Sequence, residues 1–243
     1  MFKHKWAEIP RIKQVNTPEG RRYEVGDTQY AYPSITTVLG ATADKTWLYE
    51  WRARVGEEKA NAISQAATRR GTSMHKLCER YLKNEDLAAD MPTSEEDKDF
   101  AELRSGDWTA GQLLFHGIRP ALDRVDNVRA LEVGLFSHKL KVAGTVDCIA
   151  ELDGTLSIID FKTSKRDKEK SGISDYFMQG AFYFAAYHEI TGELPKQISI
   201  LIAVQGGGFQ EFTIKGREII HWTEQLKKRI EAYYYNVDNT TKD

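Results

Sequence analysis

In the second half of the chain, short apolar runs alternate with turn-forming residues, a pattern typical of buried strands. Strands are predicted near residues 129–136, 140–152, 155–163, 197–204 and 209–214. Apolar positions with helical spacing predict an aromatic-rich helix over residues 174–191 and a final helix over about 217–234. This order of elements indicates an α/β fold with a central mixed sheet flanked by helices.

The first half of the chain has a different pattern. Residues 10–38 contain Pro-Glu-Gly and Val-Gly-Asp turns and the β-branched run Ser34–Val38, which together predict a small strand-rich segment. Residues 45–69 have helical spacing and are followed by two punctuating residues, Gly71 and Thr72. We expect Thr72 to cap a new helix.

An acidic stretch, residues 84–98, predicts an exposed loop, and a further helix is expected over roughly 107–124. The chain contains no internal repeat. We therefore expect one domain over residues 1–243. Its expected parts are an N-terminal extension (1–60), a core (about 70–215), and a C-terminal helix and tail (216–243).

Composition narrows the class of protein. With 243 residues, 41% of them hydrophobic, the chain can bury a core, and its net charge of −2 excludes a protein that coats nucleic acid through bulk charge. It does not exclude a locally basic groove. The two cysteines, Cys78 and Cys148, cannot form a four-cysteine cluster, so neither an iron–sulfur cluster nor a zinc framework is expected. Without a long apolar run or a signal-peptide core, a cytoplasmic protein with no membrane contact is expected.

One hairpin carries the first chemical signal. Asp153 and Gly154 predict a two-residue turn, because a type I′ turn requires positive φ at both positions. This turn would place Asp147 directly opposite Asp160 on one face of the sheet, with Cβ atoms roughly 5 Å apart. The period of the strand puts Lys162 on that face too.

Two carboxylates this close repel each other unless a cation or a proton lies between them. Oxygen ligands favour Mg²⁺ or Mn²⁺, and a lysine beside such a metal can stabilise charge on an attacked phosphate. The alternative is a solvated ion pair of Asp160 with Lys162 on an exposed sheet face, since the Asp-x-Lys spacing alone is a weak signal.

Two helical pairs carry further candidates. His75 lies one turn before Glu79, and Gln179 lies one turn before Tyr183. Taken alone, His75 is compatible with an ordinary surface or core histidine. Gln179 is equally compatible with one hydrogen-bonding residue on a buried aromatic helix.

The motifs occur in a recognisable order. Arg70 to Glu79 reads R-G-T-x-x-H-x-x-x-E, Gly144 to Asp147 reads G-x-x-D, Asp160 to Lys162 reads D-x-K, and Gln179 to Tyr183 reads Q-x-x-x-Y. With Glu132 on the first core strand, they resemble the RecB-like branch of the PD-(D/E)xK nucleases, whose fold is restriction-endonuclease-like. The stretch from Tyr32 to Ala60 is similar to phage exonucleases related to the mitochondrial genome maintenance exonuclease.

The resemblance implies a role for each matched residue. His75, Asp147, Asp160 and the main-chain carbonyl of Phe161 would hold the metal, and Lys162 would assist catalysis. Gln179, also a candidate catalytic residue, and Tyr183 would contact the substrate backbone and brace the site. Glu132 and Glu79 could support either the site or the fold. Val146 stands in place of the proline of the family motif, and loss of that proline is normal in the RecB-like branch. The four cysteines that hold an iron–sulfur cluster in CRISPR-associated relatives are missing.

The function implied is a Mg²⁺-dependent DNA exonuclease of a phage or bacterium, with Mn²⁺ able to substitute. It would act on free ends of DNA, single strands above all, in DNA degradation, replication or recombination, and proteins of those processes are candidate partners. Arg70, Lys165 and Arg166 could contact phosphates, although a charge run is also compatible with a solvated loop. Two alternatives stay open: a structure-specific or restriction-type endonuclease, and a catalytically inactive DNA-binding protein.

Overall fold

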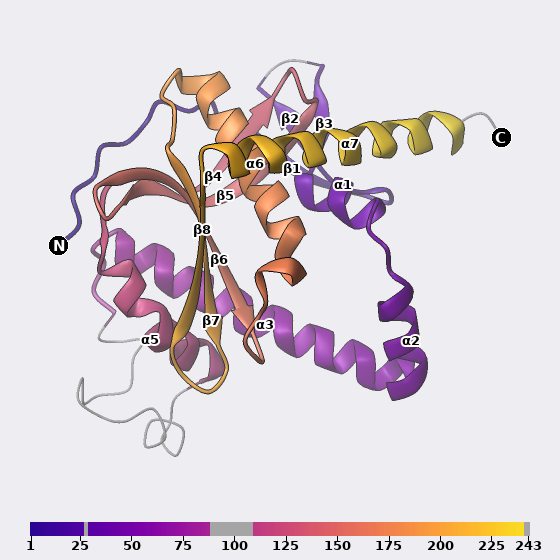
Figure 1. Ribbon diagram of the computed structural model, residues 1–243, viewed down its shortest axis with the longest axis horizontal. Coiled ribbons are helices and arrows are strands. Elements are labelled where there is room, and N and C mark those ends of the chain that lie inside the picture. The colour runs from indigo at the N-terminus through magenta and orange to yellow at the C-terminus, as the bar shows by residue number, and fades with distance from the viewer. Residues whose placement is uncertain (27–28, 88–108, 241–243) are drawn as a thin grey trace.

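The computed structural model describes residues 1–26, 29–87 and 109–240, and its centre is a five-stranded sheet (Figure 1). The strand order is β4-β5-β6-β7-β8, in which β6 and β7 run parallel and the other neighbours are antiparallel. The strands are β4 (Val125–Ser137), β5 (Val142–Leu152), β6 (Thr155–Ser164), β7 (Gln197–Val204) and β8 (Phe209–Lys215). The predicted mixed sheet is therefore confirmed.

Helices cover both faces of this sheet (Figure 1). One face packs against α3 (Glu57–Leu82) and α5 (Ala110–Leu122), through buried residues such as Met74 and Leu114. The other face packs against α1 (Ile35–Ala41), α6 (Ser174–Thr191) and α7 (Arg217–Thr240), through residues such as Phe182. A short 3-10 helix, η1 (Lys170–Ile173), leads into α6. Among the described residues, no helix combines the length and apolarity that a membrane crossing requires.

The N-terminal segment forms a separate small sheet, β1 (Ile12–Thr17), β2 (Gly20–Val25) and β3 (Ala31–Pro33). The prediction of strand for the whole β-branched run was wrong, because α1 begins at Ile35 with Ser34 as its N-cap. The Ser34 hydroxyl accepts a hydrogen bond from the main-chain N–H of Thr37 at 3.0 Å, which satisfies a free donor of the first turn. This cap outweighs the weak strand preference of the β-branched residues.

The predicted helix break at Gly71 and Thr72 was also wrong. The helix α3 continues from Glu57 to Leu82, and the break lies earlier, at Gly56, which separates it from α2 (Thr46–Val55). Gly71 lies close to β6, since a Cβ added there would meet the Thr163 hydroxyl at 3.8 Å. Of the acidic stretch 84–98, the part from residue 88 onward lies outside the described residues.

The hairpin between β5 and β6 has the predicted register. Leu152 pairs with Thr155, and the ladder continues to Cys148 opposite Ile159. Asp153 and Gly154 have φ angles of 51° and 72°, as a type I′ turn requires. The next positions along the two strands are Asp147 and Asp160, so the turn places these acids side by side.

Candidate active site

The main-chain pairing of β5 with β6 ends just before the two aspartates. Beyond Cys148 and Ile159 the strands no longer pair, and a side chain enters the gap: Asp147 Oδ2 accepts a hydrogen bond from the Phe161 N–H at 2.7 Å. In a strand, the N–H and the C=O of one residue point to the same edge. The Phe161 carbonyl therefore also faces β5, in the direction of Asp147.

A third acid lies on the neighbouring strand. Between the pairs Leu131–Cys148 and Val133–Val146, Glu132 falls opposite Asp147. Its φ angle of 49° is left-handed, a conformation that costs a residue with a side chain about 1 to 2 kcal/mol. The left-handed residue interrupts the regular alternation of β4 at this point. Acids on three adjacent strands therefore meet at one level of the sheet.

The histidine comes from the helix on one face of the sheet. His75 Nδ1 lies 3.6 Å from Asp147 Oδ1 and 3.7 Å from Glu132 Oε1. One donor atom from each of these residues lies within 4.8 Å of the others. A nitrogen and two carboxylate oxygens at this spacing fit a divalent cation such as Mg²⁺ or Mn²⁺. The chemistry of the donors thus agrees with a divalent metal ion.

The lysine approaches from the opposite side of the gap. Asp160 is fully buried, neither of its carboxylate oxygens makes a regular hydrogen bond, and its charged partner is Lys162, whose Nζ lies 2.5 Å from Oδ2. Lys162 Nζ also donates to Gln179 Oε1 at 3.2 Å and lies 5.1 Å from the centre of the Tyr176 ring. A buried carboxylate with unused acceptor sites is costly unless another cation can reach it.

The electrostatic environment keeps both bases protonated. Burial alone would lower the pKa of His75, but its contacts with Asp147 and Glu132 outweigh burial and raise the pKa to about 10. Burial would also lower the pKa of Lys162, and the charges of Asp160 and Asp147 raise it instead. In the metal-free protein both groups therefore carry a positive charge at neutral pH.

The two aspartates are affected in opposite directions. Burial raises the pKa of Asp160 to about 6, even though Lys162 acts against that rise. Burial acts on Asp147 as well, but its contacts with His75 and the charge of Lys162 prevail, and the pKa of Asp147 is lowered. Burial and the nearby Asp147 raise the pKa of Glu132. A metal cation that enters this site would therefore meet carboxylates whose negative charge is partly balanced by the protonated His75 and Lys162.

We predict that metal binding releases a proton from His75. Imidazole must lose its second proton to ligate a metal, so affinity should increase with pH as long as the pH is below the raised pKa. With one proton released, Mn²⁺ affinity should rise about tenfold per pH unit between pH 6.5 and 8.5. Calorimetric titration in two buffers of different protonation enthalpy measures both the affinity and the proton count.

His75→Ala supplies the control for that titration. This variant should bind Mn²⁺ more weakly with a flatter pH dependence, and metal-dependent cleavage should fall by at least about tenfold. An unchanged pH slope in the variant, or wild-type turnover at low Mg²⁺, would contradict a ligand role for His75.

The remaining predicted residues lie around this centre at different depths. Tyr183 is buried, and its hydroxyl donates to the Thr145 carbonyl at 2.6 Å while accepting from Gln179 Nε2 at 3.1 Å. Lys165 and Arg166 are exposed directly after β6, and Arg70 is half-buried on α3. The structure thus brings Gln179 to Lys162 and leaves the basic residues at the rim.

Glu132, which the sequence left open between supporting the site and supporting the fold, lies in the site, and Tyr176 joins it without having been assigned to it. Glu132 has a detectable signal, because it is a single charged residue within the apolar run Ala130–Leu131–Val133. Tyr176 has none, since an aromatic residue on an aromatic-rich helix is ordinary core composition. Glu79 lies beyond Glu132 and forms an ion pair with Lys83 at 2.6 Å.

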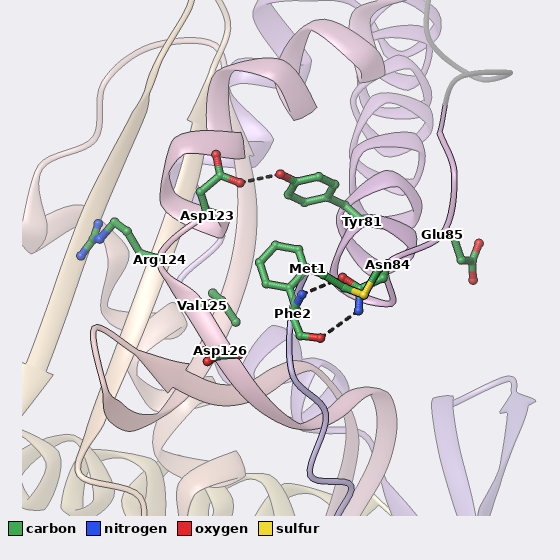
Figure 2. A pocket seen from close by; sticks show the side chains of 9 residues that line it. All are labelled: Met1, Phe2, Tyr81, Asn84, Glu85, Asp123, Arg124, Val125 and Asp126. Carbon is green, nitrogen blue, oxygen red and sulfur yellow. Dashed lines mark hydrogen bonds between the residues drawn. The ribbon is translucent and has the colours of Figure 1, made fainter.

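Of two surface pockets, one coincides with the candidate active site and the other does not. One, of about 460 Å³, is lined by His75, Glu132, Glu79 and their neighbours on α3, so the histidine side of the site is open to solvent. The other, of about 550 Å³, contains none of the predicted residues (Figure 2). There Asn84 holds the main chain of Phe2 by two hydrogen bonds, of 2.7 and 2.9 Å. This second pocket lies where the N-terminal segment docks, and it offers no catalytic group of the motifs.

Comparison with known proteins decides the family. The profile of the PD-(D/E)XK nuclease superfamily matches residues 45–242, which is most of the chain and includes every motif residue described above. The chain belongs to the PD-(D/E)XK nuclease superfamily. For this nuclease, the sheet with helices on both faces is the expected fold, and Asp147 and Asp160 lie in the middle of β5 and β6, within the matched residues.

Individual relatives of the nuclease agree with this assignment. It is 26% identical over 213 residues to mitochondrial genome maintenance exonuclease 1 of Homo sapiens, covering 83% of this chain and 58% of the human protein. The protein of that name from Mus musculus is 27% identical over 143 residues, which are 56% of this chain and 38% of the mouse protein. The nuclease thus spans less than two thirds of these curated relatives.

Among solved structures, the nuclease is similar to a candidate exonuclease from Eubacterium rectale. The sequence identity is 12%, the alignment covers 70% of this chain and 66% of that one, and the TM-score is 0.43. A likeness at this level adds nothing to the assignment, which depends on the family match.

Proposed function

We propose that this nuclease is a metal-dependent DNA exonuclease that hydrolyses phosphodiester bonds from free ends, with a preference for single strands. The observation that carries the proposal is the convergence of His75, Glu132 and Asp147 on one point, beside the buried pair Asp160–Lys162. The names of the curated relatives support exonuclease action. The proposal treats residues 1–243 as one catalytic unit.

The family resemblance and the geometry of the gap support a set of metal-binding groups. His75, Asp147 and Asp160 would hold Mg²⁺ or Mn²⁺, together with the Phe161 carbonyl, and Glu132 adds a further carboxylate on the solvent side. When bound, such an ion lowers the pKa of a water molecule and polarises a phosphate oxygen. Lys162 would place a fixed positive charge where charge develops on the phosphate, and Gln179 would orient the lysine.

Substrate binding would use the projecting arm formed by α2 and the N-terminal half of α3, which extends past the sheet (Figure 1). A pocket of about 500 Å³ between these helices is lined by Trp47, Trp51 and Ile63, among others, and Trp47 is 66% exposed. Exposed aromatic rings can stack on bases of any sequence. Ala67, the lining residue nearest to the site along α3, lies eight residues before His75, ~12 Å at 1.5 Å per residue.

The rim of the site supplies phosphate contacts in this proposal. Arg70 on α3 and Lys165 and Arg166 after β6 flank the gap, and none of them forms a salt bridge in the described part of the chain. A phage or bacterial cytoplasmic role in DNA degradation, replication or recombination is proposed only from the resemblance of Tyr32–Ala60 to phage exonucleases.

The decisive test compares linear and covalently closed circular single-stranded DNA of one sequence, with Mg²⁺ present. An enzyme that needs a free end should shorten the linear strand and leave the circle intact. Duplex DNA with blunt ends should be cut more slowly than the linear single strand, because stacked and paired bases cannot reach the Trp47–Trp51 pocket. Product lengths on a denaturing gel measure all three rates.

The other outcomes identify the alternatives. Rapid nicking of the circle would favour an endonuclease of the same fold. Binding of the DNA without cleavage, at any Mg²⁺ or Mn²⁺ concentration, would favour an inactive DNA-binding protein. Addition of EDTA should stop cleavage by the wild-type protein, and cleavage that persists in EDTA would contradict metal dependence.

A further inference from the structure

The gap between β5 and β6 is bridged by side chains in place of main-chain hydrogen bonds. In the register of the hairpin, Thr145 would lie opposite Lys162, but pairing has already ended at Cys148 and Ile159. From α6, Tyr183 donates to the Thr145 carbonyl at 2.6 Å, and Gln179 donates to the Tyr183 hydroxyl at 3.1 Å. Gln179 in turn accepts from Lys162 Nζ at 3.2 Å. A series of hydrogen bonds through Tyr183 and Gln179 therefore links the Thr145 carbonyl to the Lys162 ammonium group.

Gly144 is required by the same bridge. A Cβ at this position would lie 3.1 Å from Tyr183 Cε1 and 3.2 Å from its hydroxyl oxygen, closer than ordinary contacts. The missing side chain lets the Tyr183 ring lie directly against β5. This gives the first residue of the G-x-x-D motif a physical reason that does not involve the metal.

The N-terminal sheet holds the other side of Thr145. The Tyr23 hydroxyl, on β2, lies 3.0 Å from Thr145 Oγ1 and donates to Gln14 Oε1 at 3.3 Å. Ser34, which follows β3, forms a bridge with Ala143 on the part of β5 that β6 has left. Tyr23 is only 2% exposed and packs with Phe136 and Ala143. The small sheet thus covers and fixes the end of β5 that carries the motif.

We propose that Tyr23 is a positioning residue for Lys162, acting through Thr145, Tyr183 and Gln179; this rests on the catalytic role proposed above for the lysine. Tyr23 fixes the Thr145 side chain, and the Thr145 carbonyl fixes the Tyr183 hydroxyl. A hydrogen-bonded chain with one member removed loses the geometry of the others, because each donor sets the orientation of the next. The N-terminal extension is in this way part of the catalytic unit.

The test is Tyr23→Phe, which removes the hydroxyl and keeps the ring in its packing. We expect kcat on linear single-stranded DNA to fall about threefold to tenfold, the scale of one neutral hydrogen bond, with KM and DNA affinity unchanged. Tyr32→Phe is the matched control. Tyr32 lies in the same small sheet, is 7% exposed, and bonds His138 Nδ1 at 2.7 Å, away from the site. It should lose comparable stability and keep its kcat.

A second pair of variants separates positioning from folding. Thr145→Val removes the hydroxyl and should lower kcat as Tyr23→Phe does, whereas Thr145→Ser keeps it and should restore kcat. In the double variant Tyr23→Phe/Thr145→Val the two losses should not multiply, because they break one hydrogen bond.

Three outcomes would overturn the proposal: an unchanged kcat in Tyr23→Phe, equal losses in Tyr23→Phe and Tyr32→Phe that follow the melting temperature, or losses that multiply in the double variant. An inactive wild-type protein would instead contradict the nuclease function itself.

Discussion

Replacing Asp147 by asparagine is expected to reduce metal-dependent cleavage by roughly 10³-fold, the largest effect of any single substitution in this protein. Asp147 contacts both the histidine and the neighbouring strand β6: His75 Nδ1 lies at 3.6 Å and the Phe161 N–H at 2.7 Å. Asparagine keeps the shape and can still accept from Phe161. It removes the negative charge that attracts both the cation and the protonated histidine.

The same substitution should be visible without any substrate. Wild-type protein should gain thermal stability from Mn²⁺, since a ligand that binds only the folded state stabilises it, and Asp147→Asn should gain little. Loss of the carboxylate should also lower the pKa of His75, because its contact with Asp147 is the largest cause that raises it.

Glu151→Gln is the matched control for Asp147→Asn. Glu151 lies on the same strand but pairs with Arg129 at 3.4 Å, away from the site. This variant should keep both the cleavage rate and the stabilisation by Mn²⁺. If Asp147→Asn retained wild-type cleavage at saturating Mg²⁺, the metal centre would have to lie elsewhere.

Much of this site could be predicted because local rules determine it. The Asp153–Gly154 turn sets the hairpin register through backbone φ angles alone, and the register then places Asp147 beside Asp160. Because side chains two positions apart in a strand lie on the same face, Lys162 is predicted to lie on the face of Asp160. Each of these steps depends on residues close together in the sequence.

What could not be predicted depends on contacts between distant segments. Glu132 adopts a left-handed conformation that brings its carboxylate to Asp147 and His75. The residues next to Glu132 in the sequence do not indicate this conformation. Gly71 suggested a helix end, yet the packing of α3 against the sheet carries the helix through it. Tyr23 reaches Thr145 across 122 positions, beyond the range of any spacing rule.

Replacing Lys162 by alanine is expected to separate chemistry from binding. At saturating DNA and Mg²⁺, cleavage should fall by roughly 10² or more, because the lysine supplies positive charge where the transition state gains negative charge. The affinity for single-stranded DNA should change little, since Lys162 is only 18% exposed and already bonded to Asp160 and Gln179. Filter binding in Ca²⁺ and single-turnover cleavage in Mg²⁺ measure the two quantities independently.

In Lys162→Ala, a loss of stability must be distinguished from a loss of catalysis. Removing one partner of a buried ion pair costs about 3 to 5 kcal/mol, and Asp160 would be left without its cation. The pKa of Asp160, already raised to about 6 by burial, should rise further when Lys162 is absent, so the variant should be relatively more stable at low pH. Melting curves at pH 5 and pH 8, with and without Mn²⁺, should show this trend.

Lys165→Ala is expected to show the opposite pattern to Lys162→Ala, with weaker DNA binding and an unchanged chemical step. Lys165 is exposed just beyond the same strand, where it can neutralise a phosphate of the bound strand, whereas Asp160 is fully buried in the middle of β6. Removal of Lys165 should weaken DNA binding for every sequence and reduce the salt dependence of binding by about one ion, with kcat unchanged. If affinity fell with rate in Lys162→Ala as well, the buried lysine would be a phosphate anchor, and the charge that stabilises the transition state would have to come from the metal alone.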